Sequence, residues 1–158
     1  MSRRLDELIR QGLVSPVPVI LGPRDQKNRR LFWTAEFEQW ARQICETHRS
    51  RSIASSAEQL NIMFADFISG RPLTSGLARC DPPKGEGIWR LKTPDFRLYG
   101  WAIDNQAMVL AYGELKSVLK KSGFPRDGDY GRFTVAKRNQ LRLEHKLGER
   151  YELFPATN

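Results

Sequence analysis

The chain has 158 residues, of which 40% are hydrophobic and 10% aromatic, so it can fold as one domain with a packed core. Its 26 Lys and Arg residues exceed its 18 Asp and Glu residues, which gives a formal net charge of +8. This excess favours polyanions or anionic surfaces as partners, although a merely solvated basic surface has the same composition. The only two cysteines, Cys45 and Cys80, are too few and too far apart for a disulfide framework or a zinc site.

The sequence indicates a cytoplasmic protein without membrane contact. The residues up to Glu7 contain no apolar segment of signal-peptide length. No run of about 18 apolar residues marks a membrane span. We therefore expect both cysteines to be reduced, with Cys45 buried on the apolar face of a helix.

An amino-terminal extension is expected over residues 1–30. Apolar residues at helical spacing predict a short helix over 4–13, and Gly12 is placed to end it. Pro16 and Pro18 cannot continue a helix, because each fixes φ and lacks a backbone donor. The segment around them is expected to be extended.

Two amphipathic helices are predicted after a short strand over 30–33. Thr34 can cap the first helix, over 35–48, and Ser56 to Gln59 has the form of a capping box that opens the second, over 56–69. Each helix carries an apolar stripe at positions i, i+3, i+4, i+7 and i+8: Phe37, Trp40, Ala41, Ile44 and Cys45 in the first, Leu60, Met63, Phe64, Phe67 and Ile68 in the second. We interpret both stripes as core.

The hydrophobic period changes to two after Gly87. This change predicts strands over 88–92, 96–103 and 106–112, with Asp104 and Asn105 as the hairpin turn between the last two. Helices followed by consecutive hairpins are typical of an α+β fold. We expect the two helices to cover one face of an antiparallel sheet and to leave the other face free for a ligand.

The carboxy-terminal part is basic. A short helix is predicted over 115–121, followed by a Gly- and Pro-rich break over 123–128. Residues 133–147 read as a second basic helix, and 149–154 as a last short strand. We treat 123–158 as an extension that packs on or beside the core.

Long cations are concentrated on the three predicted strands and just after them. Arg90 and Lys92 alternate with apolar residues and so share one face of their strand, and Arg97 opens the next strand. We expect four cations and two aromatic residues to meet in one region: Arg90, Lys92, Arg97, Lys116, Tyr99 and Trp101. The two histidines show no shared site, and His48 is expected to face solvent at a helix end.

Such a cluster suits RNA strand cleavage, in which the 2′-hydroxyl attacks the adjacent phosphate. Fixed Arg and Lys donors can stabilise the developing charge, and Arg97 is our candidate because guanidinium can hold two phosphate oxygens. A lysine crowded by cations has a lowered pKa and can accept a proton; Lys92 is our candidate. Aromatic rings nearby can stack an unpaired base. The alternative is a sheet face that is simply solvated.

Residues 31 to about 121 resemble the RelE/HigB/ParE superfamily of type II toxin–antitoxin toxins. The segment from Leu31 to Trp40 is similar to the family's opening strand and first helix. The segments 87–92 and 96–99 resemble its strands of pattern Gly-x-aromatic-basic-aliphatic-basic and aromatic-Arg-aliphatic-aromatic. The stretch 112–116 resembles the turn that bears a later basic residue. The resemblance implies a RelE-like core over 31–122.

The resemblance also implies an activity. RelE-like members cut messenger RNA in the ribosomal A site without a metal or cofactor, using Lys and Arg of this sheet. By position, the catalytic residues here are Arg90, Lys92, Arg97 and Lys116, and the RNA-binding residues are Tyr99, Trp101, Lys120 and Lys121. The implied partners are mRNA on the ribosome and a cognate antitoxin, with DNA contact through the antitoxin complex.

Two other interpretations stay open. ParE-like members inhibit DNA gyrase and cut nothing, so the fold alone does not establish the chemistry. A non-catalytic member could also bind nucleic acid or protein. The chain departs from the family after the last strand, where a catalytic tyrosine or histidine is common and Lys120 and Lys121 stand instead. Tyr130 is a distant substitute.

Overall fold

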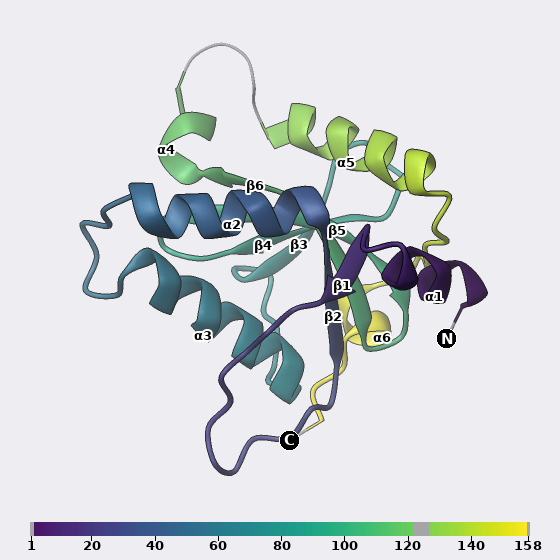
Figure 1. Cartoon of the computed structure of the whole chain (residues 1–158), viewed down its shortest axis with the longest axis horizontal. Coiled ribbons are helices and arrows are strands. Elements are labelled where there is room, and N and C mark those ends of the chain that lie inside the picture. Colours follow the sequence, from purple (N-terminus) through teal and green to yellow (C-terminus); the bar gives the residue numbers. More distant parts are fainter. Residues whose placement is uncertain (1, 122–126, 158) are drawn as a thin grey trace.

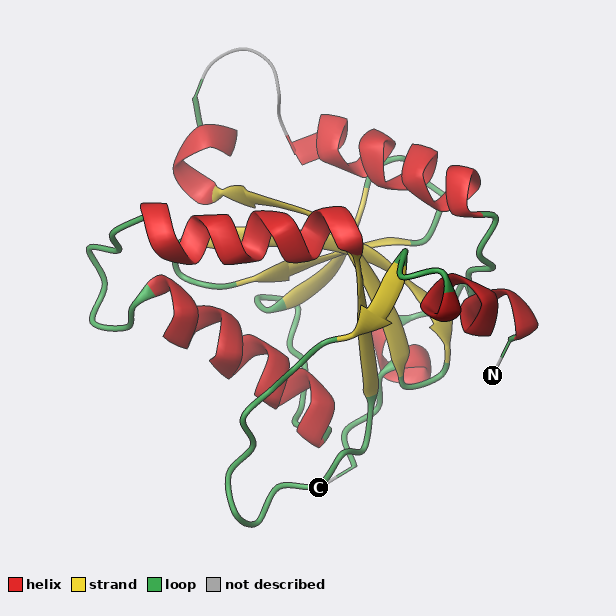
Figure 2. Cartoon of the chain, viewed as in Figure 1, coloured by secondary structure: helices red, strands yellow, loops and turns green. Residues whose placement is uncertain are grey.

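The computed structural model describes residues 2–121 and 127–157. Within these residues a six-stranded sheet in the order β1-β2-β6-β5-β4-β3 is combined with helices (Figure 1, Figure 2). The strands are β1 (Val14–Pro16), β2 (Arg30–Thr34), β3 (Ala78–Asp81), β4 (Ile88–Lys92), β5 (Phe96–Asp104) and β6 (Ala107–Leu115). The helices are α1 (Arg3–Arg10), α2 (Ala35–Thr47), α3 (Ser56–Ser69), α4 (Lys116–Leu119), α5 (Asp127–Leu141) and α6 (Arg150–Leu153). The predicted α+β class is confirmed.

The sheet is mixed, whereas an antiparallel one was expected. β2 pairs in parallel with β6, with Leu31 opposite Met108, and the other neighbouring strands pair antiparallel. The hairpins that link β4, β5 and β6 were visible in the sequence. A parallel pair joins strands that are distant in the chain, so no turn signal predicts it.

Capping residues set the ends of the two predicted helices. The Thr34 side chain accepts a hydrogen bond from the backbone N–H of Phe37 and so begins α2. Ser55 caps α3, one residue before the expected Ser56, and accepts from the N–H of Glu58. Gly70 ends α3 with a φ of 86°, a conformation that glycine adopts readily.

A core lies between α2, α3 and one face of the sheet. Phe64 and Phe67 are 4% and 0% exposed, which confirms their prediction as core. Trp40 is only partly buried, although it was predicted as core; its ring packs on Gly113 of β6, where a Cβ atom would meet it at 2.2 Å. Cys45 is exposed, contrary to expectation, since α2 buries only the side of Phe37 and Ala41.

The opposite face of the sheet is also covered, so the expected free face is wrong. Figure 1 shows α5 over β5 and β6, and α1 beside the edge strand β1. Under these helices lies a second core, in which Leu5 and Leu8 of the amino-terminal extension pack with Leu141 and Leu143 of the carboxy-terminal one. Both extensions are therefore part of the packed fold.

Several boundaries differ from expectation. The hairpin turn lies at Asn105 and Gln106, and Gln106 has a φ of 58°. The Gly- and Pro-rich segment before Gly87 contains the edge strand β3, which periodicity cannot reveal in four residues. The predicted break over 123–128 lies mostly outside the described residues.

The carboxy-terminal elements are also shifted. α5 begins at Asp127 and ends at Leu141, so 142–147 are not helical. The predicted strand over 149–154 is instead the helix α6. Glu149 and Glu152 form a capping box that favours this helix. In the described part of the chain, no helix is both long and apolar enough to cross a membrane.

Candidate functional site

The predicted cations meet around one cavity at the end of the sheet nearest α4. The cavity measures about 310 Å3, and we call it the basic pocket. It is lined by residues of β4, β5, α4 and the chain directly after α4: Arg90, Lys92, Arg97, Lys116, Leu119 and Lys120. Four of these cations were predicted as catalytic and Lys120 as RNA-binding. Lys121, also predicted to bind RNA, is exposed and does not line the pocket.

Strand register and a short helix bring these side chains together. Lys92 on β4 is directly opposite Arg97 on β5, and Arg90 lies two residues earlier on the same face as Lys92. Lys116 begins α4, where its N–H donates to the carbonyl of Asp95 at 2.7 Å. Lys120 follows by four residues, a spacing that places both lysines on one side of the helical turn.

Repulsion among these cations perturbs one lysine. The pKa of Lys116 lies below its usual value, first because of the charge of Lys120 and a hydrogen bond to it, and then because of Arg97 and Lys92. A lowered pKa raises the fraction of neutral amine, which is the form that accepts a proton. The sequence suggested this effect at Lys92, whereas the structure identifies it at Lys116.

Arg97 is a fixed donor at the floor of the pocket. Its side chain is largely buried, and Nη1 donates to the carbonyl oxygens of Thr93 and Phe96 at 2.8 and 2.9 Å. These bonds hold the guanidinium against the turn between β4 and β5. A preorganised donor of this kind loses little entropy when it meets an anion.

Tyr99 and Trp101 are not available to stack a base. Both are 0% exposed. The ring of Tyr99 stacks on Tyr130 of α5, with centroids 5.5 Å apart, and Trp101 lies in the second core beneath α1. The prediction that they bind RNA is therefore wrong, because α5 and α1 cover the face on which they lie.

Tyr130 looked distant in the sequence, but in the structure it packs against the sheet. Its hydroxyl donates to Oε2 of Glu114 at 2.5 Å, and Glu114 is opposite Arg97 in the sheet. Burial, followed by the interaction with Glu114, raises the pKa of Tyr130 above its usual value. The phenol therefore stays protonated and is not suited to act as a base.

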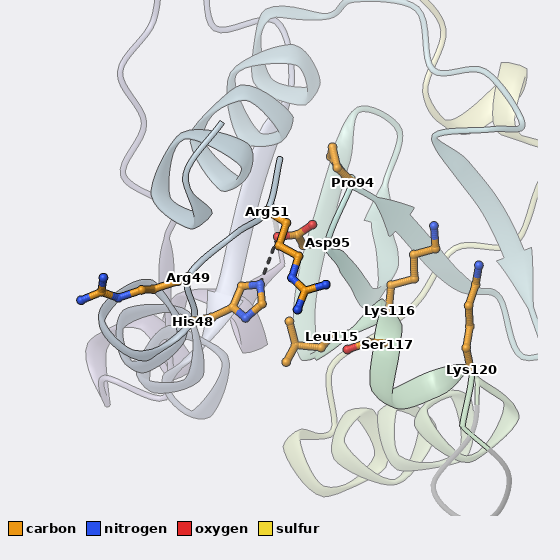
Figure 3. Close-up of a pocket in the computed structure, with 9 residues that line it drawn as sticks. All are labelled: His48, Arg49, Arg51, Pro94, Asp95, Leu115, Lys116, Ser117 and Lys120. Carbon is orange, nitrogen blue, oxygen red and sulfur yellow. Dashed lines mark hydrogen bonds and ion pairs between the residues drawn. The ribbon is translucent and has the colours of Figure 1, made fainter. Parts of the chain in front are cut away.

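A second cavity adjoins the basic pocket and was not predicted. It measures about 600 Å3, and we call it the loop pocket because the loop after α2 forms one wall (Figure 3). Lys116 and Lys120 line both cavities. The other lining residues are His48, Arg49, Arg51, Pro94, Asp95, Leu115 and Ser117.

The loop pocket contains a histidine paired with a carboxylate. Nε2 of His48 lies 3.0 Å from Oδ2 of Asp95, and their side chains are 24% and 20% exposed. The expectation that His48 faces solvent is thus wrong. The two residues are 47 positions apart, so no sequence spacing could have revealed the pair.

No family model, curated protein or solved structure matches this chain. The site is therefore interpreted from its own geometry. The residues that the structure describes include no group of three or more His, Cys, Asp and Glu side chains that could hold a metal ion.

Proposed function

We propose that this chain is the toxin of a type II toxin–antitoxin system and cuts messenger RNA on the ribosome. The observation that carries the proposal is the basic pocket, in which five cations from β4, β5 and the α4 region surround one cavity. Each phosphate of an RNA strand carries one negative charge, so a strand bound in this pocket offsets the repulsion among these side chains. Among the described residues, none that lines this pocket is a carboxylate, which favours an anionic ligand.

The chemistry that these residues support is attack of a 2′-hydroxyl on the adjacent phosphorus. Arg97, held by the backbone, is placed to stabilise charge on the phosphoryl oxygens. Lys116 is the better candidate for accepting the 2′-hydroxyl proton, because neighbouring cations lower its pKa. Arg90, Lys92 and Lys120 then hold the strand. Because the nucleophile belongs to RNA, this route requires no metal.

The α+β class of the fold supports the proposal. Two helices, α2 and α3, cover one face of the sheet, and Arg90, Lys92 and Arg97 lie on the hairpin strands that follow them. The proposed partners follow from the same reading: mRNA on the ribosome in the cytoplasm, a cognate antitoxin, and DNA through the antitoxin complex. No cofactor is part of the proposal.

A non-catalytic member of the same fold, including a ParE-like gyrase inhibitor, is the second candidate. The observation in its favour is that the aromatic rings predicted to stack a base are covered. A protein that only binds its partner needs the cations and does not need exposed aromatic rings. Gyrase supercoiling measured with the purified chain separates this candidate from the first.

The test of the proposal is single-turnover cleavage of ribosome-bound message by purified protein. The variants are Arg97→Lys and Lys116→Met, with the exposed Lys84→Met as the charge-matched control for the second. Loss of one preorganised donor is expected to slow cleavage by about 100- to 1000-fold in Arg97→Lys. The unfolding midpoint of each variant is measured as well. It shows whether slower cleavage comes from the lost donor or from a fold destabilised by loss of the hydrogen bonds to Thr93 and Phe96. A wild type that does not cut contradicts the proposal.

A further inference from the structure

We infer that His48, positioned by Asp95, is the general acid of this site and protonates the 5′-oxygen that leaves when the RNA strand is cut. This inference rests on the proposed function and adds a residue that the sequence did not suggest. His48 lies in the loop pocket, which shares Lys116 and Lys120 with the basic pocket. A phosphate held by these two lysines therefore has His48 on one side and the basic pocket on the other.

The pair with Asp95 determines which ring nitrogen can react. Although burial alone raises it, the pKa of Asp95 is lowered overall by hydrogen bonds with Ser50, His48 and Gln59. The carboxylate is then ionised at neutral pH and can only accept hydrogen bonds. Nε2 of His48 must therefore carry a hydrogen that it donates to Asp95, and Nδ1 is the nitrogen that exchanges a proton with a ligand.

Contacts besides the pair itself hold His48 and Asp95 in place. The His48 ring packs edge-to-face with the ring of Phe96, with centroids 5.6 Å apart and an interplanar angle of 70°. The carbonyl of His48 accepts from Oγ of Ser56 at 3.0 Å, which fixes the backbone at the end of α2. Gln59 Oε1 accepts from the backbone N–H of Asp95 at 3.0 Å, so the backbone that carries the carboxylate is anchored to α3. These contacts fix both members of the pair before any ligand arrives.

The charges around the pair are suited to an anionic substrate. Figure 3 shows Arg49 and Arg51 on the same loop as His48, and Lys116 and Lys120 across the pocket. Asp95 is the single acidic residue among the residues lining this pocket, and it is engaged by His48. In Figure 3 the Arg49 side chain extends away from His48, so Arg51, Lys116 and Lys120 are the cations placed to hold phosphates beside the imidazole.

The proposed step is balanced in atoms and protons. Lys116 takes the proton of the 2′-hydroxyl, and the 2′-oxygen forms a bond to phosphorus. The bond from phosphorus to the 5′-oxygen breaks, and this oxygen takes the proton from Nδ1 of His48. The products are a 2′,3′-cyclic phosphate and a 5′-hydroxyl, and exchange with water resets both side chains.

The alternative is a purely structural role, in which His48 and Asp95 only hold the loop between α2 and α3 in place. A leaving-group substitution distinguishes the two roles, because a 5′-sulfur leaves as a thiolate and needs no acid. The experiment uses the full chain and ribosome-bound message with either oxygen or sulfur at the 5′ position of the cut linkage. The variants are His48→Ala, His48→Gln and Asp95→Asn. His145→Ala is the control, since His145 is exposed and lies outside both pockets.

We expect His48→Ala and His48→Gln to cut the oxygen message about 100- to 10,000-fold more slowly than wild type, and the sulfur message within about tenfold of it. Asp95→Asn should show a smaller loss that sulfur also rescues. One inflection of the wild-type pH–rate profile should disappear in His48→Ala. His145→Ala should match wild type.

Two results overturn the inference and are distinguishable. If wild type cuts and the His48 variants cut the oxygen message equally fast, or sulfur does not rescue them, His48 is not the acid and the proposed function stands. If wild type cuts neither message, the proposed function fails and this inference fails with it.

Discussion

Lys92 and Arg97 lie directly opposite each other on β4 and β5, so two cations share one face of the sheet at a paired position. Like charges in this position destabilise a sheet. The repulsion between Lys92 and Arg97 therefore destabilises the folded protein, and a bound anionic ligand relieves it. This relationship links the stability of the protein to its proposed ligand.

We predict that Lys92→Gln stabilises the protein by about 0.2–1 kcal/mol in low salt, because it removes one of the two facing charges. The free energy of unfolding in urea measures the effect. Lys84→Gln, at an exposed position outside both pockets, should change stability little. A lower stability of Lys92→Gln than of wild type contradicts the view that these cations repel each other.

The lowered pKa of Lys116 is predicted to depend on Lys120. Removing a neighbouring positive charge makes the charged amine less unfavourable, so Lys120→Gln should raise the pKa of Lys116 toward its usual value. NMR titration of the lysine side chains measures this directly and does not depend on activity. The matched control is Lys121→Gln, which removes the adjacent charge outside the pocket. Equal titration in all three proteins contradicts the proposed cause.

The Asp95 carboxylate is predicted to stabilise the fold at neutral pH and to lose this effect in acid. Its folded-state pKa is lowered, so the stabilisation is present above the unfolded value of about 3.9 and is lost as pH falls through the folded value. Asp95→Asn should thus be less stable than wild type at pH 7, with the difference shrinking below about pH 4. Thermal unfolding across pH measures it, with the exposed Glu144→Gln as control. A difference that does not vary with pH contradicts the prediction.

Phe67 is predicted to be among the main contributors to core stability. It is 0% exposed, and its ring packs on Phe154 with centroids 5.4 Å apart. Phe67→Ala should cost about 3–5 kcal/mol in the free energy of unfolding. Ile62→Ala, on the exposed side of the same helix, should cost under about 0.5 kcal/mol. Similar losses at both positions are inconsistent with the observed burial.

Local patterns in the sequence predicted the elements that define the fold class. Helical spacing identified α2 and α3 with Phe64 and Phe67 in the core, and alternation placed Arg90 and Lys92 on one face of β4. The grouping of cations follows from this alternation and from the hairpins. These are short-range features, and each depends on residues a few positions apart.

Long-range packing was beyond such patterns. The parallel pairing of β2 with β6 leaves no local signal, and neither does the contact between Tyr99 and Tyr130 that covers the sheet. The weakly amphipathic α5 gave no indication of where it packs. His48 and Asp95 are brought together only by the fold, so the loop pocket could not be predicted from either residue.

The central claim is that the basic pocket holds RNA phosphates, and the salt dependence of RNA affinity tests it most directly. Each phosphate neutralised on a single strand contributes about −0.7 to the slope of log affinity against log salt concentration. The double variant Arg90→Ala/Lys92→Ala should remove one to two such contributions and so flatten the slope by about 0.7 to 1.4. The control, Arg24→Ala/Lys27→Ala, removes the same residue types from the loop between β1 and β2, which Figure 1 shows far from α4. A flatter slope in the pocket variant alone is the predicted result, and an unchanged slope contradicts the account.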